Sequence, residues 1–270
     1  MIIIGEKING SIPSVCKAIA NRNEAFIRKL AKKQADAGAD YIDVCASVSD
    51  DDEIEVMKWL IDIVQDTVDT PICIDSPNPN TCAACIPFCK KEGIVNSVSL
   101  EGNKIEVIFP AIANTGWQVI ALLCDNRGIP NTVERRLEIA KEIMEKAKEY
   151  GIAPSRIYID PLVTALSTDG ETLRKFTACA SKIREWYPDV HITSGLSNIS
   201  YGLPARKCIN EAFMVLAMNA GMDSAIVDPL NRDMLGVIYA TDALIENDEF
   251  CLEFIHAFRE GRIGPVKEAK

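Results

Sequence analysis

The stretch TPICIDSPNPNTCAACIPFCKKEGIVNS, residues 70–97, decides the fold of this chain. It contains two short apolar runs, Ile72–Ile74 and Ile94–Val95, each too short for a helix and typical of a strand buried on both faces. Between them, Asn80–Lys91 carries apolar residues at helical spacing, and Gly93 follows as a helix-ending residue. The stretch therefore predicts a strand, a helix and a second strand parallel to the first.

The same unit repeats along the whole chain. Further strands are expected at Ile2–Ile4, Tyr41–Cys45, Val119–Leu123, Ile157–Ile159, Val190–Thr193 and Ala225–Val227. Further helices are expected at Glu24–Ala37, Glu53–Val68, Asn103–Gly116, Val133–Tyr150, Gly170–Trp186, Ala205–Ala220 and Asp233–Asn247. Eight units in 270 residues average about 34 residues each, which is the length of a βα repeat.

This repeat predicts a single-domain (β/α)8 TIM barrel over residues 1–262, followed by a charged C-terminal tail at 263–270. A doubly wound sheet is the weaker alternative, because no glycine-rich phosphate loop follows the first strand.

Composition excludes several classes of function. The chain carries 29 Lys and Arg against 39 Asp and Glu, a net charge of −10, and has no basic run, which argues against a nucleic-acid partner. No apolar run reaches the roughly 18 residues that a membrane span needs, and no signal peptide opens the sequence. We therefore expect a cytoplasmic protein in which most of the ten cysteines are reduced and buried.

Polar side chains follow the predicted strands, where the chemistry of a barrel takes place. They include Glu6, Asp43, Asp75, Asn96, Asp125, Asp160, Ser197, Asn198 and Asp228. Carboxylates and carboxamides suit a neutral heterocycle with donors and acceptors, such as a pterin ring, whereas a phosphorylated substrate would require cations. Such residues can instead merely cap the following helices, but for Asp75, Asn96, Asp160 and Asn198 together we favour a binding site.

Five motifs in order along the chain resemble the pterin-binding barrel family. They are Gly5–Gly10 (GEKING), Ile74–Ser76 (IDS), Val95–Ser97 (VNS), Tyr158–Leu162 (YIDPL) and Gly195–Ser200 (GLSNIS). Within that family the chain looks most like methyltetrahydrofolate:corrinoid protein methyltransferases, over roughly its whole length.

The resemblance implies a role for each matching position. Asp75, Asn96 and Asp160 would hydrogen-bond the pterin, and Asn198 would reach the nitrogen that carries the methyl group. Gly195, Ser197 and Arg206 would line the rest of the site, while Glu6, Asp43 and Asp228 are further possible contacts. Asn198 and Asp160 are the candidate catalytic residues.

The family also implies the other participants. Tetrahydrofolate and methyltetrahydrofolate are the small-molecule substrates, and the corrinoid (cobalamin) belongs to a separate partner protein, since no Asp-x-His-x-x-Gly corrinoid motif occurs in this chain. Family members are homodimers. Because His191 is expected in the barrel wall, the proton would travel through Asn198, Asp160 and water.

Two alternatives remain open at this point. One is a dihydropteroate synthase-like pterin enzyme, disfavoured because the arginines and histidine that such an enzyme needs for a pyrophosphate are missing. The other is a non-catalytic folate-binding barrel, disfavoured because binding alone does not require Asn198.

Two local patterns have competing interpretations. Cys82, Cys85 and Cys89 could ligate zinc or an iron–sulfur cluster, but their spacing also places them on one helix face, and we expect no tightly bound metal. The acidic run at 49–53 is interpreted as capping the helix Glu53–Val68.

Overall fold

The computed structural model describes residues 1–265. Within them, eight parallel strands form one sheet in the order β7-β6-β5-β4-β3-β2-β1-β8. The strands are β1 (Ile2–Asn9), β2 (Tyr41–Cys45), β3 (Ile72–Asp75), β4 (Ile94–Leu100), β5 (Gln118–Asp125), β6 (Ile157–Asp160), β7 (His191–Ile192) and β8 (Ser224–Val227).

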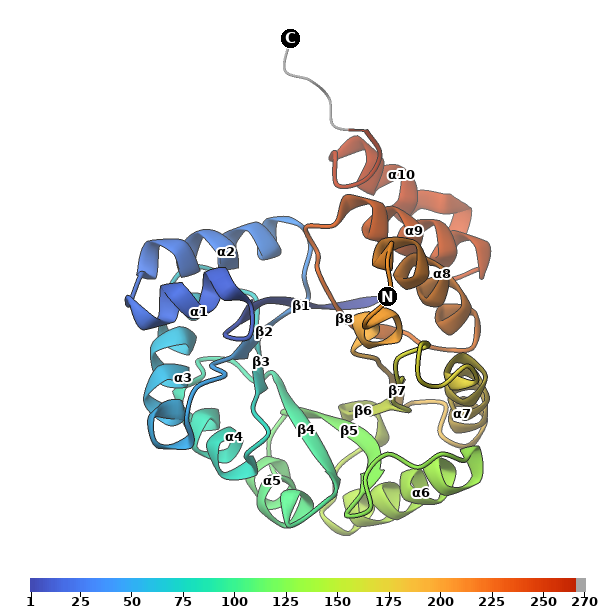
Figure 1. The fold of residues 1–270 in the computed structure, drawn as a ribbon, viewed down its shortest axis with the longest axis horizontal. Helices are drawn as coiled ribbons and strands as arrows, with labels where there is room; N and C mark the ends of the chain where they lie inside the picture. Colours follow the sequence, from blue (N-terminus) through green and yellow to red (C-terminus); the bar gives the residue numbers. More distant parts are fainter. Residues whose placement is uncertain (266–270) are drawn as a thin grey trace.

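The sheet closes into a barrel between its first and last strands. Ile226 N donates to Ser194 O at 3.0 Å, Asp223 N donates to Ile192 O at 3.1 Å, and a parallel bridge joins Gly195 to Ile226. The helices surround the strands on the outside (Figure 1). The single-domain (β/α)8 barrel is thus confirmed, whereas the boundary at residue 262 stays a prediction.

The helices and 3-10 turns alternate with the strands. They are α1 (Pro13–Ala20), α2 (Glu24–Asp36), α3 (Asp50–Gln65), α4 (Pro79–Cys85), η1 (Ile86–Phe88), α5 (Lys104–Ile112), α6 (Val133–Glu149), η2 (Pro154–Arg156), α7 (Thr172–Trp186), η3 (Leu196–Ser200), α8 (Arg206–Asn219), α9 (Arg232–Leu244), η4 (Glu249–Cys251) and α10 (Leu252–Arg259). Helices α1 and α10 were not expected from the sequence. Of the expected tail at 263–270, residues 266–270 lie outside the described residues.

Alternation along each strand separates two apolar layers. Ile4, Cys73, Ile94, Ile120 and Tyr158 form a small buried cluster, while their strand neighbours belong to the large cluster that packs against the helices. Because successive side chains of a strand point to opposite faces, the small cluster fills the barrel interior. The same alternation decides which polar residues at the strand ends face the barrel mouth.

Cys82 and Cys85 are buried within α4, as the packing interpretation predicted. Cys89 lies beyond that helix, because the helix expected at Asn80–Lys91 ends at Cys85 and continues only as the short turn η1, where Pro87 lies. Within residues 1–265, His, Cys, Asp and Glu side chains form no group of three or more that could hold a metal ion.

In the same part of the chain, no helix combines the length and the apolar character that a membrane span requires. All ten cysteines are free thiols.

Candidate active site

Inward-pointing polar residues form a ring at the carboxyl ends of the strands. Asp75 lies two residues beyond the interior residue Cys73, and Asn96 and Asp160 stand in the same relation to Ile94 and Tyr158. Residues two apart on a strand share a face, so all three side chains point into the barrel mouth. Register supports this placement, because Asp75 pairs directly with Asn96 across β3 and β4. The structure thus brings together three of the predicted pterin contacts.

Two expected positions differ slightly from the structure. Asn96 was expected after a strand ending at Val95, but β4 continues through it to Leu100. Asp43 was expected at a strand end, yet it lies inside β2 and is buried. Strands tolerate these polar residues because the barrel mouth, not a hydrophobic core, surrounds the inner face at this level.

Asp160 is held by main-chain donors. Its Oδ1 accepts from Leu162 N at 2.7 Å and its Oδ2 accepts from Gly195 N at 3.4 Å. Burial raises the pKa of this carboxyl to about 6, against the opposing effects of the two N–H groups and of the nearby Arg136 guanidinium. The carboxylate is therefore oriented by the barrel and ionised at neutral pH, ready to accept further N–H donors.

Burial is the main cause of the raised pKa values of three further acids near the mouth. Burial raises the pKa of Asp75 to about 6. For Asp43, burial and then the Asp75 carboxylate raise the pKa well above its usual range, and its Oδ1 has no hydrogen-bond partner among the described residues. Burial, with the charge of Asp228, raises the pKa of Glu6 to about 7. Such perturbed acids gathered in one mouth are typical of a functional site.

Asn198 projects from the turn η3, and its side chain is exposed. Gly195 leaves room for it, since a Cβ at that position would lie 3.3 Å from Asn198 Nδ2. Arg206 supports the turn from α8: its Nη2 donates to Ser197 O at 2.7 Å and its Nε donates to Ser200 Oγ at 2.9 Å. Gly195 also bonds Asp160, so the segment carrying Asn198 is attached to the ring.

On the other side of the mouth, Lys7 Nζ forms an ion pair with Asp228 Oδ2 at 3.1 Å. Glu6 and Lys7 belong to β1 rather than following it, at a register shift between Gly5 and Ile8. Gln34 holds this irregular segment, accepting from Lys7 N at 2.9 Å. The three possible contacts Glu6, Asp43 and Asp228 thus lie at the same end of the barrel as the ring.

Sequence reasoning missed the buried support that Glu53 gives to the ring. Glu53 was assigned to helix capping, but α3 begins at Asp50, and Glu53 turns inward to accept from Ser76 Oγ at 2.8 Å and Thr81 Oγ1 at 2.7 Å. It fixes the loop that follows Asp75. Nothing in the sequence of the acidic run distinguishes this buried carboxylate from its exposed neighbours.

His191 lies at the opposite end of the barrel from the mouth. Its Nδ1 is 2.9 Å from Asp223 Oδ2, and its ring stacks on Tyr158 with centroids 4.5 Å apart. The expectation of a barrel-wall residue is confirmed.

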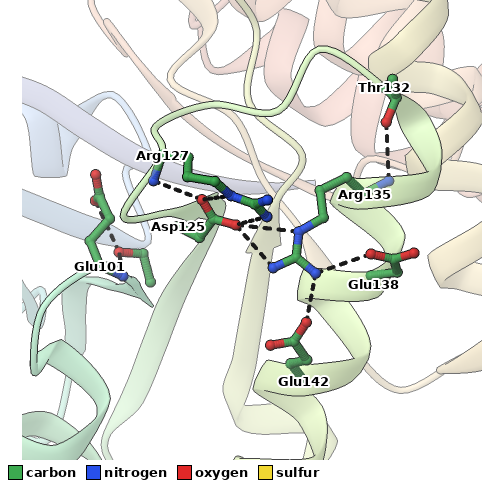
Figure 2. A network of polar contacts seen from close by, with 8 residues as sticks. Glu101, Asp125, Arg127, Thr132, Arg135, Glu138 and Glu142 are labelled. Atoms are coloured by element: carbon green, nitrogen blue, oxygen red, sulfur yellow. Dashed lines mark hydrogen bonds and ion pairs between the residues drawn. The ribbon is translucent and has the colours of Figure 1, made fainter.

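Asp125 differs from the other strand-end acids. It follows Cys124 on β5 and points outward, where Arg127 and Arg135 bind its carboxylate (Figure 2). The hydrogen bonds from Arg127, with those from Arg135, hold the pKa of Asp125 well below its usual range. Because two arginines bind its carboxylate, Asp125 does not belong to the ring.

The geometry therefore defines a TIM barrel whose mouth presents carboxylates and carboxamides to a ligand rich in N–H and C=O groups. The pterin-binding enzyme family model matches residues 5–228, and the chain belongs to this family.

The chain is also similar to individual proteins of known name. The chain is 56% identical to the methylcorrinoid:tetrahydrofolate methyltransferase of Eubacterium limosum, with 99% of each chain covered. It is 28% identical to the methionine synthase of Mycobacterium tuberculosis, where the match covers 86% of this chain and 21% of that protein.

Among solved structures, the fold resembles dihydropteroate synthase from Xanthomonas albilineans with 7,8-dihydropteroate, at a TM-score of 0.63 and 18% identity. That match covers 90% of this chain and 93% of the other. A Yersinia pestis dihydropteroate synthase with a pterine-sulfa conjugate has a TM-score of 0.66 at 15% identity, with the same coverage. At these identities the likeness shows the fold alone.

Proposed function

We propose that this chain is a methyltransferase that moves a methyl group between tetrahydrofolate and the cobalt of a separate corrinoid protein. The observation that carries the proposal is the ring of Asp75, Asn96 and Asp160, with Asn198 attached to it through Gly195. The Eubacterium limosum relative, 56% identical over its full length, supports this activity and, by its name, the direction from methylcorrinoid to tetrahydrofolate.

In this proposal Asp160 and Asp75 accept N–H bonds from the pterin, while Asn96 donates and accepts. Gly195, Ser197 and Arg206 complete the site, and Glu6, Asp43 and Asp228 are further contacts at the same end of the barrel. The partner's corrinoid supplies the cobalt that gives up or accepts the methyl group.

The barrel also handles a proton. When tetrahydrofolate takes the methyl group as a cation equivalent, its nitrogen uses its lone pair and loses its proton, and cobalt keeps the bonding electrons. In the reverse direction the nitrogen must gain that proton before it can leave. Asn198 stabilises the charged nitrogen by hydrogen bonding, and Asp160 and water carry the proton onward.

A dihydropteroate synthase activity fits the site less well. Such an enzyme must hold a pyrophosphate, but Lys7 and Arg206 at the mouth are already engaged: Lys7 pairs with Asp228, and Arg206 bonds the η3 turn. An anion would have to break one of these contacts first.

The proposed reaction can be tested with free cobalamin in place of the partner protein. We expect the purified chain to convert methylcobalamin and tetrahydrofolate to reduced cobalamin and methyltetrahydrofolate, and to catalyse the reverse reaction, followed by the absorbance of the cobalt species. Tetrahydrofolate binding without transfer in either direction would favour the non-catalytic folate-binding barrel instead.

We further propose that the chain forms a homodimer and is cytoplasmic, the latter supported by its ten free thiols. Helices α8, α9 and α10 lie side by side on one flank (Figure 1). Exposed apolar side chains gather there: Val215, Leu216, Leu244, Phe250, Leu252, Ile255 and Phe258. Exposed apolar side chains on neighbouring helices are suited to a protein interface.

The double variant Leu244→Glu/Phe250→Glu tests the interface, because these side chains are 79% and 81% exposed in the single chain. Burying each on association contributes about 1.5–3 kcal/mol, so two charges should raise the dimer dissociation constant at least about 100-fold. Size-exclusion chromatography with light scattering measures this. Ile54→Glu on α3 is the control and should stay dimeric, whereas a monomeric wild type would refute the dimer.

A further inference from the structure

Arg136 is the largest fully buried side chain among the described residues, with 1% of its surface exposed. Its partners are main-chain carbonyls: Nη1 donates to Pro161 O at 2.8 Å and to Leu162 O at 2.7 Å, and Nε donates to Pro130 O at 2.9 Å. A buried guanidinium is costly unless its donors are satisfied, and an apolar side chain would fill the same space without that cost. The hydrogen bonds to these carbonyls therefore account for the presence of an arginine at this buried position.

Two of those carbonyls belong to the turn that follows Asp160. Leu162 has a φ of +67°, in the left-handed region that leucine rarely adopts and that persists only where surrounding contacts impose it. Arg136 binds Leu162 O, and Asp160 Oδ1 binds Leu162 N at 2.7 Å. The same residue is thus held from both sides, and the orientation of the Asp160 carboxylate depends on the turn.

The third carbonyl belongs to the neighbouring loop between β5 and α6. That loop starts at Asp125, which Arg135 binds from the same first turn of α6 (Figure 2). Adjacent arginines of one rigid helix therefore fix the two loops that follow β5 and β6. The charge of Arg136 also favours the ionised form of Asp160, lowering a pKa that burial raises.

We propose that Arg136 is a positioning residue, which orients Asp160 for pterin recognition by clamping the Pro161–Leu162 turn. This inference rests on the proposed pterin site. Arg136 acts only through the turn that holds Asp160, so its removal should act mainly on affinity, with a smaller effect on the rate at saturation through the proton that Asp160 carries.

The chain provides a matched control in Arg156, at the other end of the same strand. This arginine also binds main-chain carbonyls, donating from Nη2 to Ile112 O at 2.6 Å and from Nε to Trp117 O at 2.8 Å. It precedes β6, whereas Asp160 ends it. Arg156→Met therefore removes a comparable clamp far from the mouth.

The experiment measures tetrahydrofolate affinity by calorimetry, thermal stability, and the KM and kcat of methyl transfer. Arg136→Met should weaken tetrahydrofolate binding about tenfold or more and raise KM in parallel, with kcat changed less than about threefold. Arg156→Met should lower stability and leave affinity unchanged. Arg136→Lys keeps the charge without the fork of donors, so it should recover part of the affinity and remain measurable if the methionine variant fails to fold.

The pH profile separates charge from geometry. Asp160 faces Arg136 and the N–H groups of Leu162 and Gly195. Loss of the Arg136 cation should therefore raise the pH below which tetrahydrofolate affinity falls in Arg136→Met. In Arg136→Lys that pH should stay unchanged. Wild-type affinity in Arg136→Lys, or equal affinity in both methionine variants, would overturn the positioning role alone. A wild type that binds no tetrahydrofolate would overturn the proposed function along with it.

Discussion

Asp160→Asn is expected to weaken tetrahydrofolate binding about 100-fold, or near 3 kcal/mol, at neutral pH. The carboxylate uses two main-chain N–H groups for its own orientation and is ionised, so its remaining lone pairs can accept the N–H donors of a pterin. An asparagine offers only one accepting atom, and its NH2 group would face another donor at Gly195 N or on the ligand. Calorimetric titration of the variant with tetrahydrofolate measures the loss.

The wild-type affinity should also depend on pH in a predictable direction. Burial raises the pKa of Asp160 to about 6, so the protein binds a proton there as the pH falls below 6, and the protonated acid can accept fewer N–H bonds. Affinity should therefore be highest above pH 7 and fall below pH 6. Asp75 titrates in the same range, so the acid limb should become shallower in Asp160→Asn rather than vanish.

Asp125→Asn is the matched control for Asp160→Asn. Both acids end a strand, but Asp125 points outward and is bound by two arginines. Its variant should bind tetrahydrofolate within about threefold of wild type. If Asp160→Asn kept wild-type affinity and activity, Asp160 would have neither the binding role nor the catalytic one.

The contrast between these two acids shows what the sequence could predict about the site. Both follow a short apolar run, so both were expected at strand ends. The two acids differ only in the face of the strand to which they belong. Asp160 shares a face with the interior residue Tyr158, whereas Asp125 follows the inward Cys124 and so points to the other face. Once an interior residue is identified on each strand, alternation predicts the ring.

Other parts of the structure leave no comparable signal. Glu53 and Arg136 occur in charged stretches that are typical of exposed helix faces, yet both are buried and support the mouth. Arg136 binds the backbone carbonyls of Pro161 and Leu162, which are distant from it along the chain. No side-chain pattern in that loop reveals these contacts. Short elements such as α1 and α10 were missed because eight residues give too few periods for a helical pattern to be recognised.

Asn198→Ala should lower the rate of methyl transfer at saturating substrate about 100-fold, while tetrahydrofolate affinity changes less than about threefold. Removing one preorganised hydrogen-bond group that acts on developing charge has an effect of this order. Asn198 is exposed on η3, and within residues 1–265 its side chain makes no hydrogen bond, so it is free to follow a nitrogen whose charge changes during transfer. The pterin ring itself is held by Asp75, Asn96 and Asp160, which the variant leaves intact.

Single-turnover kinetics with methylcobalamin and tetrahydrofolate distinguish the rate from binding, and calorimetry gives the affinity separately. Asn126→Ala is the control: this asparagine also lies in a mouth loop, but its Oδ1 accepts from Gly102 N at 2.8 Å and so serves the loop. It should leave the saturated rate unchanged. If Asn198→Ala instead weakened binding and kept the saturated rate, Asn198 would be a binding residue only, and the ring acids, with Glu6 at a pKa of about 7, would have to manage the proton without it.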